Sequence, residues 1–266
     1  MSYTKSALQI LLCLIALPCK AGQSTQASAP NATALLQSSL LALSGGHPLT
    51  DVTLSGTAQR IAGSDDESGT VVIKALAGIG SRMDLTFPSG ARSEIRNTSA
   101  GPAGSWSGPD GVAHAMAYHN LLTDPAWSPA LAIAAALSAP NAIITFIGTE
   151  TRNEQSVIHI SASQQFPNAS TDGSVLMQHL TKTEIFLDPG TSLPVSILFN
   201  THADTNALLD IPIEIQFSSY TAVGGAEIPF RVQRFLDNSL TLDLQFSSAT
   251  LNSGVSPSIF ATGGAQ

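Results

Sequence analysis

Apolar and polar residues alternate along much of the chain with a period of two. In the first such segment, Val52, Leu54 and Ala58 are apolar, whereas Thr53 and Ser55 are polar. Alternation sends successive side chains to opposite faces of a strand, so it predicts a sheet with one apolar and one solvated face. Strand-like segments occupy residues 52–59, 71–76, 82–87, 91–97, 144–147, 157–162, 175–187, 195–199, 211–217, 228–232 and 240–246.

Helical periodicity interrupts this pattern in three places. Leu35, Leu36, Leu40 and Leu43 recur at helical spacing, and Gly45 ends that segment. A second helix is expected at 114–122 and a third at 129–138, where Ser128 and Pro129 provide a start and Pro140 a stop. The third helix is rich in alanine and has almost no polar face, so it needs to be covered. Residues 98–111 look like a loop.

These elements together predict an α+β fold that is mainly antiparallel β. A sheet of roughly nine to eleven strands with one apolar face has to close, pack on a second sheet or be covered by helices. The three expected helices favour the last arrangement.

The first 21 residues have the pattern of a signal peptide. Lys5 precedes an apolar run over residues 7–18, which is shorter than the ~20 residues that span a bilayer. Small residues allow cleavage after Ala21 or after Ala27, and we favour Ala21. Lipidation of Cys19 is disfavoured because Pro18 precedes it. We therefore expect a signal peptide at 1–21, a flexible lead-in at 22–30, one domain at 31–262, and a periplasmic or secreted location.

Composition excludes some functions. Charged residues make up only 11% of the chain and the net charge is −8, so no basic surface is available for nucleic acid. Cys13 and Cys19 lie in the leader, so the processed chain has neither disulfides nor thiolate chemistry. After the leader, the apolar stretch 131–147 is broken by Pro140, and no transmembrane span is expected.

The sequence contains no recognisable catalytic or metal-binding motif. None of the six histidines lies in a His-Glu-x-x-His pattern, so a zinc hydrolase is not predicted. The segment 104–108 has Trp106 where a nucleophile elbow needs serine. We expect no enzyme activity, no catalytic residues, no metal and no cofactor.

Several turn and strand signatures resemble those of the LolA-type lipoprotein-sorting superfamily. They are Asp188-Pro189, Leu193-Pro194-Val195, residues 217–220, Val223-Gly224-Gly225, residues 228–231 and Phe260. The resemblance covers roughly residues 31–260. It implies an open, curved antiparallel half-barrel lidded by short helices, as in periplasmic carriers of lipid-modified cargo.

The expected ligand site is the concave apolar face of that half-barrel. Trp106 and Trp127 flank the segments that would form its mouth and lid. The lining is expected to include Met83, Leu85, Phe87, Leu131, Leu137, Leu242 and Leu244. Alternation with these residues places Arg82 and Arg92 on the outer face.

We therefore expect a protein that binds a lipid, a lipid-modified molecule or another apolar ligand, with a lipoprotein or an envelope protein as a further possible partner. The alternative is an interaction or sensor protein of the cell envelope whose concavity is filled by its own helices. The sequence does not identify the ligand or the oligomeric state.

Overall fold

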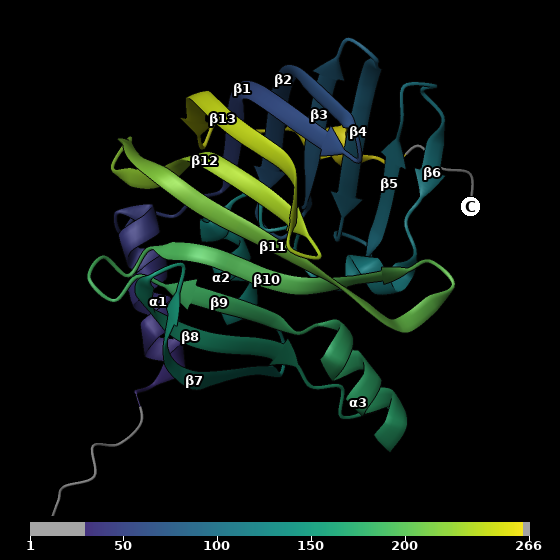
Figure 1. Cartoon of the computed structure of the whole chain (residues 1–266). Coiled ribbons are helices and arrows are strands. Elements are labelled where there is room, and N and C mark those ends of the chain that lie inside the picture. Colours follow the sequence, from purple (N-terminus) through teal and green to yellow (C-terminus); the bar gives the residue numbers. More distant parts are fainter. Residues whose placement is uncertain (1–29, 263–266) are drawn as a thin grey trace, which may run out of the picture.

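The computed structural model describes residues 30–262, which form a strongly curved antiparallel sheet partly covered by helices (Figure 1). The expected signal peptide and most of the lead-in lie outside the described residues. The strands are β1 (Asp51–Ala62), β2 (Asp65–Leu76), β3 (Gly80–Phe87), β4 (Gly90–Asn97), β5 (Ala103–Ser107), β6 (Ala113–Ala115), β7 (Ala142–Arg152), β8 (Gln155–Gln164), β9 (Thr183–Leu187), β10 (Pro194–Ala203), β11 (Asn206–Val223), β12 (Ala226–Leu236) and β13 (Ser239–Leu251).

The sheet has 13 strands in the order β6, β5, β4, β3, β2, β1, β13, β12, β11, β10, β9, β8 and β7. Sequential neighbours pair, except that β6 and β7 form the two opposite edges, and β1 pairs with β13 in the middle of the sheet. A β-bulge between Ser55 and Gly56 bends β1, and a Cβ at Gly56 would collide with the backbone of Gln245. The α+β, mainly antiparallel half-barrel is confirmed, with more strands than the nine to eleven expected.

Two of the expected helices are confirmed, and both lie on the concave side of the sheet. Helix α1 (Ala32–Ser44) begins where the Asn31 side chain accepts a hydrogen bond from the Ala34 amide at 3.2 Å. It ends at Gly45, whose φ of 60° favours glycine. Helix α2 (Pro129–Ser138) packs beside α1, and Figure 1 shows both behind the strands.

The long strand expected at 175–187 is wrong in its first half. Residues Thr171–Leu180 form helix α3, because the Ser170 side chain accepts a hydrogen bond from the Gly173 amide at 3.2 Å and caps the first turn. Only β9 remains extended. The capping residue thus favours a helix in this segment, although its apolar pattern is typical of a strand.

The helix expected at 114–122 is also wrong. The segment contains β6 and a short 3₁₀ turn, η1 (Tyr118–Leu121). His114 pairs with Trp106 on β5 and the two rings stack, with centroids 4.4 Å apart. Long-range contacts therefore replace helical hydrogen bonds here, and the expected loop at 98–111 contains β5.

The C-terminal segment covers part of the convex face. A second 3₁₀ turn, η2 (Pro257–Phe260), lies against β3 and β4, with Phe260 fully buried. Arg82 donates a hydrogen bond to the Ile259 carbonyl at 3.3 Å from that face. The outward orientation predicted for Arg82 is confirmed.

The core lies between the concave face and the two helices. It includes Leu36 and Leu43 of α1, Ile133 of α2, and Ile73 and Leu244 of the sheet. Within residues 30–262, no helix combines the length and the apolar character that crossing a membrane would require.

Candidate ligand-binding cavity

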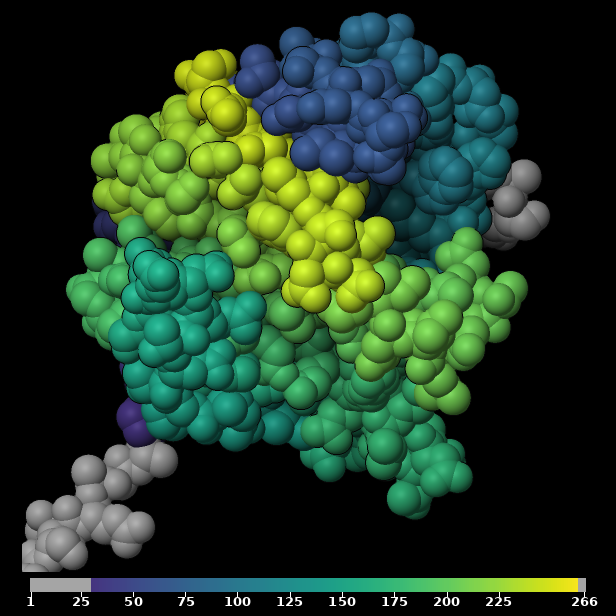
Figure 2. Space-filling model, viewed as in Figure 1, coloured from purple at the N-terminus to yellow at the C-terminus, as the bar shows by residue number. Residues whose placement is uncertain are grey.

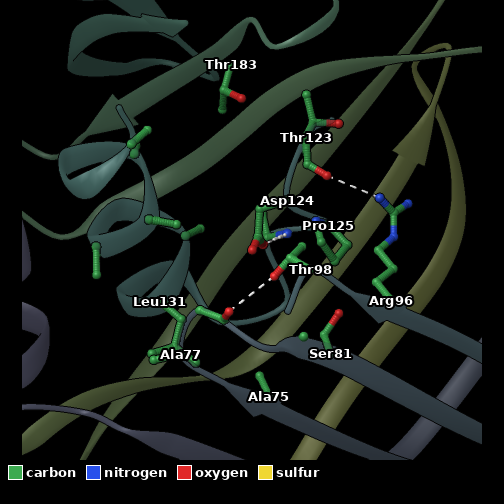
Figure 3. A pocket seen from close by; sticks show the side chains of 18 of the residues that line it. Ala75, Ala77, Ser81, Arg96, Thr98, Thr123, Asp124, Pro125, Leu131 and Thr183 are labelled. Carbon is green, nitrogen blue, oxygen red and sulfur yellow. Dashed lines mark hydrogen bonds between the residues drawn. The ribbon is translucent and has the colours of Figure 1, made fainter. Parts of the chain in front are cut away.

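A cavity of about 450 Å³ lies on the concave side, beside α2. Its walls are the inner surface of α2, the β2–β3 turn at residues 76–80, the segment 121–128, and parts of β8, β9 and β10. Figure 3 shows these elements converging around the space. A volume of this size falls in the range of ~300–1,000 Å³ that small-molecule sites occupy.

The alanine-rich face of α2 leaves this space open. Leu131, Ala132 and Ala135 recur at helical spacing on the side that lines the cavity, and Ala139 directly follows the helix. The opposite side of the helix carries Ile133, which is fully buried in the core. Because alanine has a single methyl group, α2 can dock on the sheet and still leave room beside it.

Polar groups gather in the part of the cavity formed by β4 and the segment 121–128. Thr98, Thr123 and Asp124 all contribute to its wall (Figure 3). The Asp124 carboxylate accepts a hydrogen bond from the Ala126 amide at 2.7 Å. The cavity is therefore amphipathic, with an alanine and leucine wall facing a small polar region.

Asp124 is an acidic residue of the cavity wall. Its side chain is accessible to solvent through the cavity, which is partly open, and the segments that line the cavity lie around it. Desolvation by the surrounding cavity wall raises the pKa of the Asp124 carboxyl, while the Ala126 amide and the positive charge of Arg96 act in the opposite direction. A ligand group beside Asp124 would be favoured if it donated hydrogen bonds and disfavoured if it were an anion.

Arg96 holds the polar wall in place. Its guanidinium donates hydrogen bonds to the carbonyl oxygens of Asn120 at 2.9 Å and Thr123 at 3.1 Å, and to Glu94 at 3.0 Å. Figure 3 shows the contact with Thr123. Since these contacts occupy the guanidinium, we assign Arg96 to positioning the segment 121–128.

A band of charged residues crosses the concave face next to the cavity. The register places Arg92 beside Leu85, on the inner face, so the outward orientation predicted for Arg92 is wrong. Arg92 lies 3.7 Å from Glu67, which also pairs with Arg60 at 3.3 Å. The residues of β3 that face outward do not predict which residues of β4 do so. The turn before each strand sets which of its alternate side chains face the concave side.

The residues predicted from sequence occupy different places. Trp127 and Leu131 line the cavity. Leu137 is half-buried against the core, and Trp106 is 46% exposed, outside the cavity lining. The remaining predicted residues, Met83, Leu85, Phe87, Leu242 and Leu244, are buried in the core on the concave face.

Sequence reasoning missed the polar residues of the cavity. Asp124, Thr98 and Arg96 carry no motif and lie on separate elements. The alanine-rich composition of residues 130–136 was the available signal for a cavity. A helix with such small side chains can dock on the sheet and leave empty volume beside it.

Searches with the sequence found no matching family model and no matching curated protein. The structure does have counterparts. An outer membrane lipoprotein-sorting protein domain from Vibrio parahaemolyticus aligns over 86% of this chain and 97% of its own, with 13% identity and a TM-score of 0.53. A LolA superfamily protein from Nitrosomonas europaea aligns over 88% and 98%, with 11% identity and a TM-score of 0.55.

The fold is LolA-like. A DUF1329 family protein from Desulfovibrio piger shares the architecture, with 8% identity, a TM-score of 0.52, and coverage of 86% of this chain and 97% of its own. The resemblance noted in the sequence is thus confirmed at the level of the fold, over most of the chain. At these identities, the likeness of this LolA-like chain to the three structures concerns its architecture alone.

Proposed function

We propose that this LolA-like protein binds a lipid or another molecule with an apolar chain in the cavity beside α2. The main support for this proposal is the cavity, which has a volume of about 450 Å³ and is lined by Leu131, Ala135 and Trp127, among others. A concavity filled entirely by its own helices, which was the alternative, has less support because α2 leaves this space open. The structural similarity to a lipoprotein-sorting protein domain adds to the proposal.

The role is that of a carrier or receptor of apolar cargo rather than an enzyme. Burying about ten methylenes contributes roughly 8 kcal/mol, at about 0.8 kcal/mol for each. Association costs on the order of 4 kcal/mol or more, which leaves a net binding free energy of about 4 kcal/mol or less, so a single acyl chain should bind with a dissociation constant of about 1 mM or weaker. A lipid-modified protein would add contacts outside the cavity and bind more tightly.

The polar end of the ligand is proposed to lie near Asp124 and Thr98. A neutral hydroxyl-bearing headgroup can donate hydrogen bonds to these oxygens, whereas a fatty-acid carboxylate would meet the negative charge of Asp124. We therefore expect monolaurin to bind more tightly than laurate, which has the same acyl chain.

The test uses the single-tryptophan variant Trp106→Phe, in which Trp127 is the only indole. Titration with monolaurin should shift the Trp127 emission, because that side chain lines the cavity. Ala135→Phe, which places a ring in part of the cavity, should weaken binding at least about tenfold, or about 1.4 kcal/mol. Ala91→Phe is the matched control, since Ala91 is exposed on β4 and is not part of the cavity lining.

The proposal fails if saturating monolaurin changes neither the Trp127 emission nor the thermal midpoint. It also fails if Ala135→Phe and Ala91→Phe bind the lipid equally well, because the ligand would then lie elsewhere. Native mass spectrometry of gently purified protein gives an independent measurement, with a copurifying lipid as the expected result.

Export is part of the same proposal. Residues 1–21 are proposed to be a signal peptide that directs the protein to the periplasm or the outside of the cell. N-terminal sequencing of the mature protein should begin at Gly22. A lipid-modified Cys19 or an intact Met1 would contradict it.

A further inference from the structure

Three side chains from separate elements converge at a second place, and none of them lines the cavity. They are His179 on α3, His202 on β10 and Asp210 on β11. The Nε2 atom of His179 lies 2.9 Å from the Asp210 Oδ1 atom, and the Nε2 atom of His202 lies 3.1 Å from the same oxygen. The candidate donor atoms of the three residues all lie within 4.8 Å of one another.

We propose that His179, His202 and Asp210 bind a divalent transition-metal ion of the Zn²⁺ type. Two imidazoles and a carboxylate are a donor set that Zn²⁺ uses, with bonds of about 2.0–2.2 Å. A tetrahedron with such bonds has edges of about 3.3–3.6 Å. The two contacts to Asp210 are a few tenths of an ångström shorter than that, so a small outward movement of the side chains makes room for the ion.

The buried member of the site is already fixed in position. The His202 side chain is 1% exposed. The Asn120 side chain accepts a hydrogen bond from the His202 amide and donates one to the His202 carbonyl, both at 2.8 Å. The Nδ1 atom of His202 is buried and has no hydrogen-bond partner among the described residues. This anchoring lowers the entropy that the backbone of His202 would lose on binding an ion.

The other two ligands give the ion a route from solvent. The side chains of His179 and Asp210 are 38% and 41% exposed. Water can therefore complete the coordination, and the His119 ring lies near that of His202, with centroids 5.8 Å apart. In Figure 2, α3 and the β10–β11 hairpin stand out from the rest of the surface. A bound ion would link α3 to the β10–β11 hairpin.

The experiment measures Zn²⁺ binding to metal-free protein without an affinity tag, by titration calorimetry. Wild-type protein should bind one ion, and the thermal midpoint should rise with Zn²⁺ and fall again with a chelator. His179→Gln and Asp210→Asn each remove an exposed ligand, so folding should be retained. Each should weaken binding by about 100-fold or more, since even outer-shell changes cost 10–100-fold.

Asp204→Asn is the matched control, because Asp204 is an exposed carboxylate in the same β10–β11 hairpin and is not among the grouped ligands. It should bind Zn²⁺ as wild type does. A wild-type chain that takes up no ion overturns the proposal, and so do His179→Gln and Asp210→Asn variants with unchanged affinity. The variant Ala135→Phe should keep full Zn²⁺ binding, which separates this site from the lipid cavity.

Discussion

Helices α1 and α2 both lie on the concave face of the sheet, yet they use it differently. Helix α1 presents leucines, and Leu36 and Leu43 are completely buried. Helix α2 presents alanines to the neighbouring space, and a cavity of about 450 Å³ remains there. The two helices pack against each other and share one sheet. Side-chain volume thus determines whether this concave surface is filled or left available to a ligand.

The strongest test places the same charge in each helix. Leu36→Asp buries a carboxylate at a fully enclosed position, so we expect a loss of several kcal/mol or failure to fold. Ala135→Asp puts the carboxylate where the side chain is open to the cavity, and should cost about 1 kcal/mol or less. Urea denaturation followed by circular dichroism measures both. Equal damage would mean that α2 is as tightly packed as α1.

Shortening a leucine side chain of α1 to alanine should have a smaller effect on the free energy of unfolding. Leu36→Ala should lower the free energy of unfolding by about 2–5 kcal/mol, because it removes buried methyl groups and leaves a void. Leu41→Ala, at a position 61% exposed on the same helix, should change it by about 0.5 kcal/mol or less. If the two variants unfold at the same denaturant concentration, Leu36 is not part of the core.

Filling the space beside α2 should stabilise the protein, whereas the substitutions above destabilise it. Ala135→Leu adds apolar volume inside an existing cavity and should raise the free energy of unfolding by about 0.5–1 kcal/mol. The same variant should bind monolaurin more weakly than wild type. A stabilised variant with unchanged lipid affinity would separate the cavity from the ligand site.

The smallest expected effect concerns the charge of Asp124. Desolvation by the cavity wall raises the pKa of this carboxyl above its ordinary value of 3.8, although the Ala126 amide opposes that shift. The folded chain then binds the proton more tightly than the unfolded chain, so this group costs stability as pH rises from about 3.8 through the raised pKa. Above that pKa the cost is constant.

Asp124→Asn removes the charge and keeps an oxygen for the Ala126 amide. It should therefore match wild type in stability near pH 3 and exceed it at neutral pH, as thermal unfolding at several pH values would reveal. The Asp124→Asn variant should also show a smaller difference in affinity between monolaurin and laurate than wild type does. A stability difference that does not change with pH would contradict a raised pKa of this carboxyl.

Residues 171–180 illustrate where sequence reasoning failed. Val175, Leu176 and Met177 are apolar and read as part of a strand, but Ser170 caps a helix and the backbone follows the cap. The orientation of Arg92 failed for a related reason, since the phase of β4 depends on the turn before it. In both places a local contact, rather than the hydrophobic pattern, decided the conformation.

The amino-acid sequence by itself determined the strand alternation, the helices at α1 and α2, and the LolA-like class of fold. The strands and the two helices follow from short-range periodicity, which each segment carries independently, whereas the LolA-like class was implied by the resemblance of turn and strand signatures between residues 188 and 260. The tertiary structure alone decided the cavity and the grouping of His179, His202 and Asp210. The cavity is the volume left over when α2 docks on the sheet, and the three side chains meet only because the fold brings the end of α3 close to Asp210 on β11 and His202 on β10. Both depend on packing between distant segments, which no local pattern records.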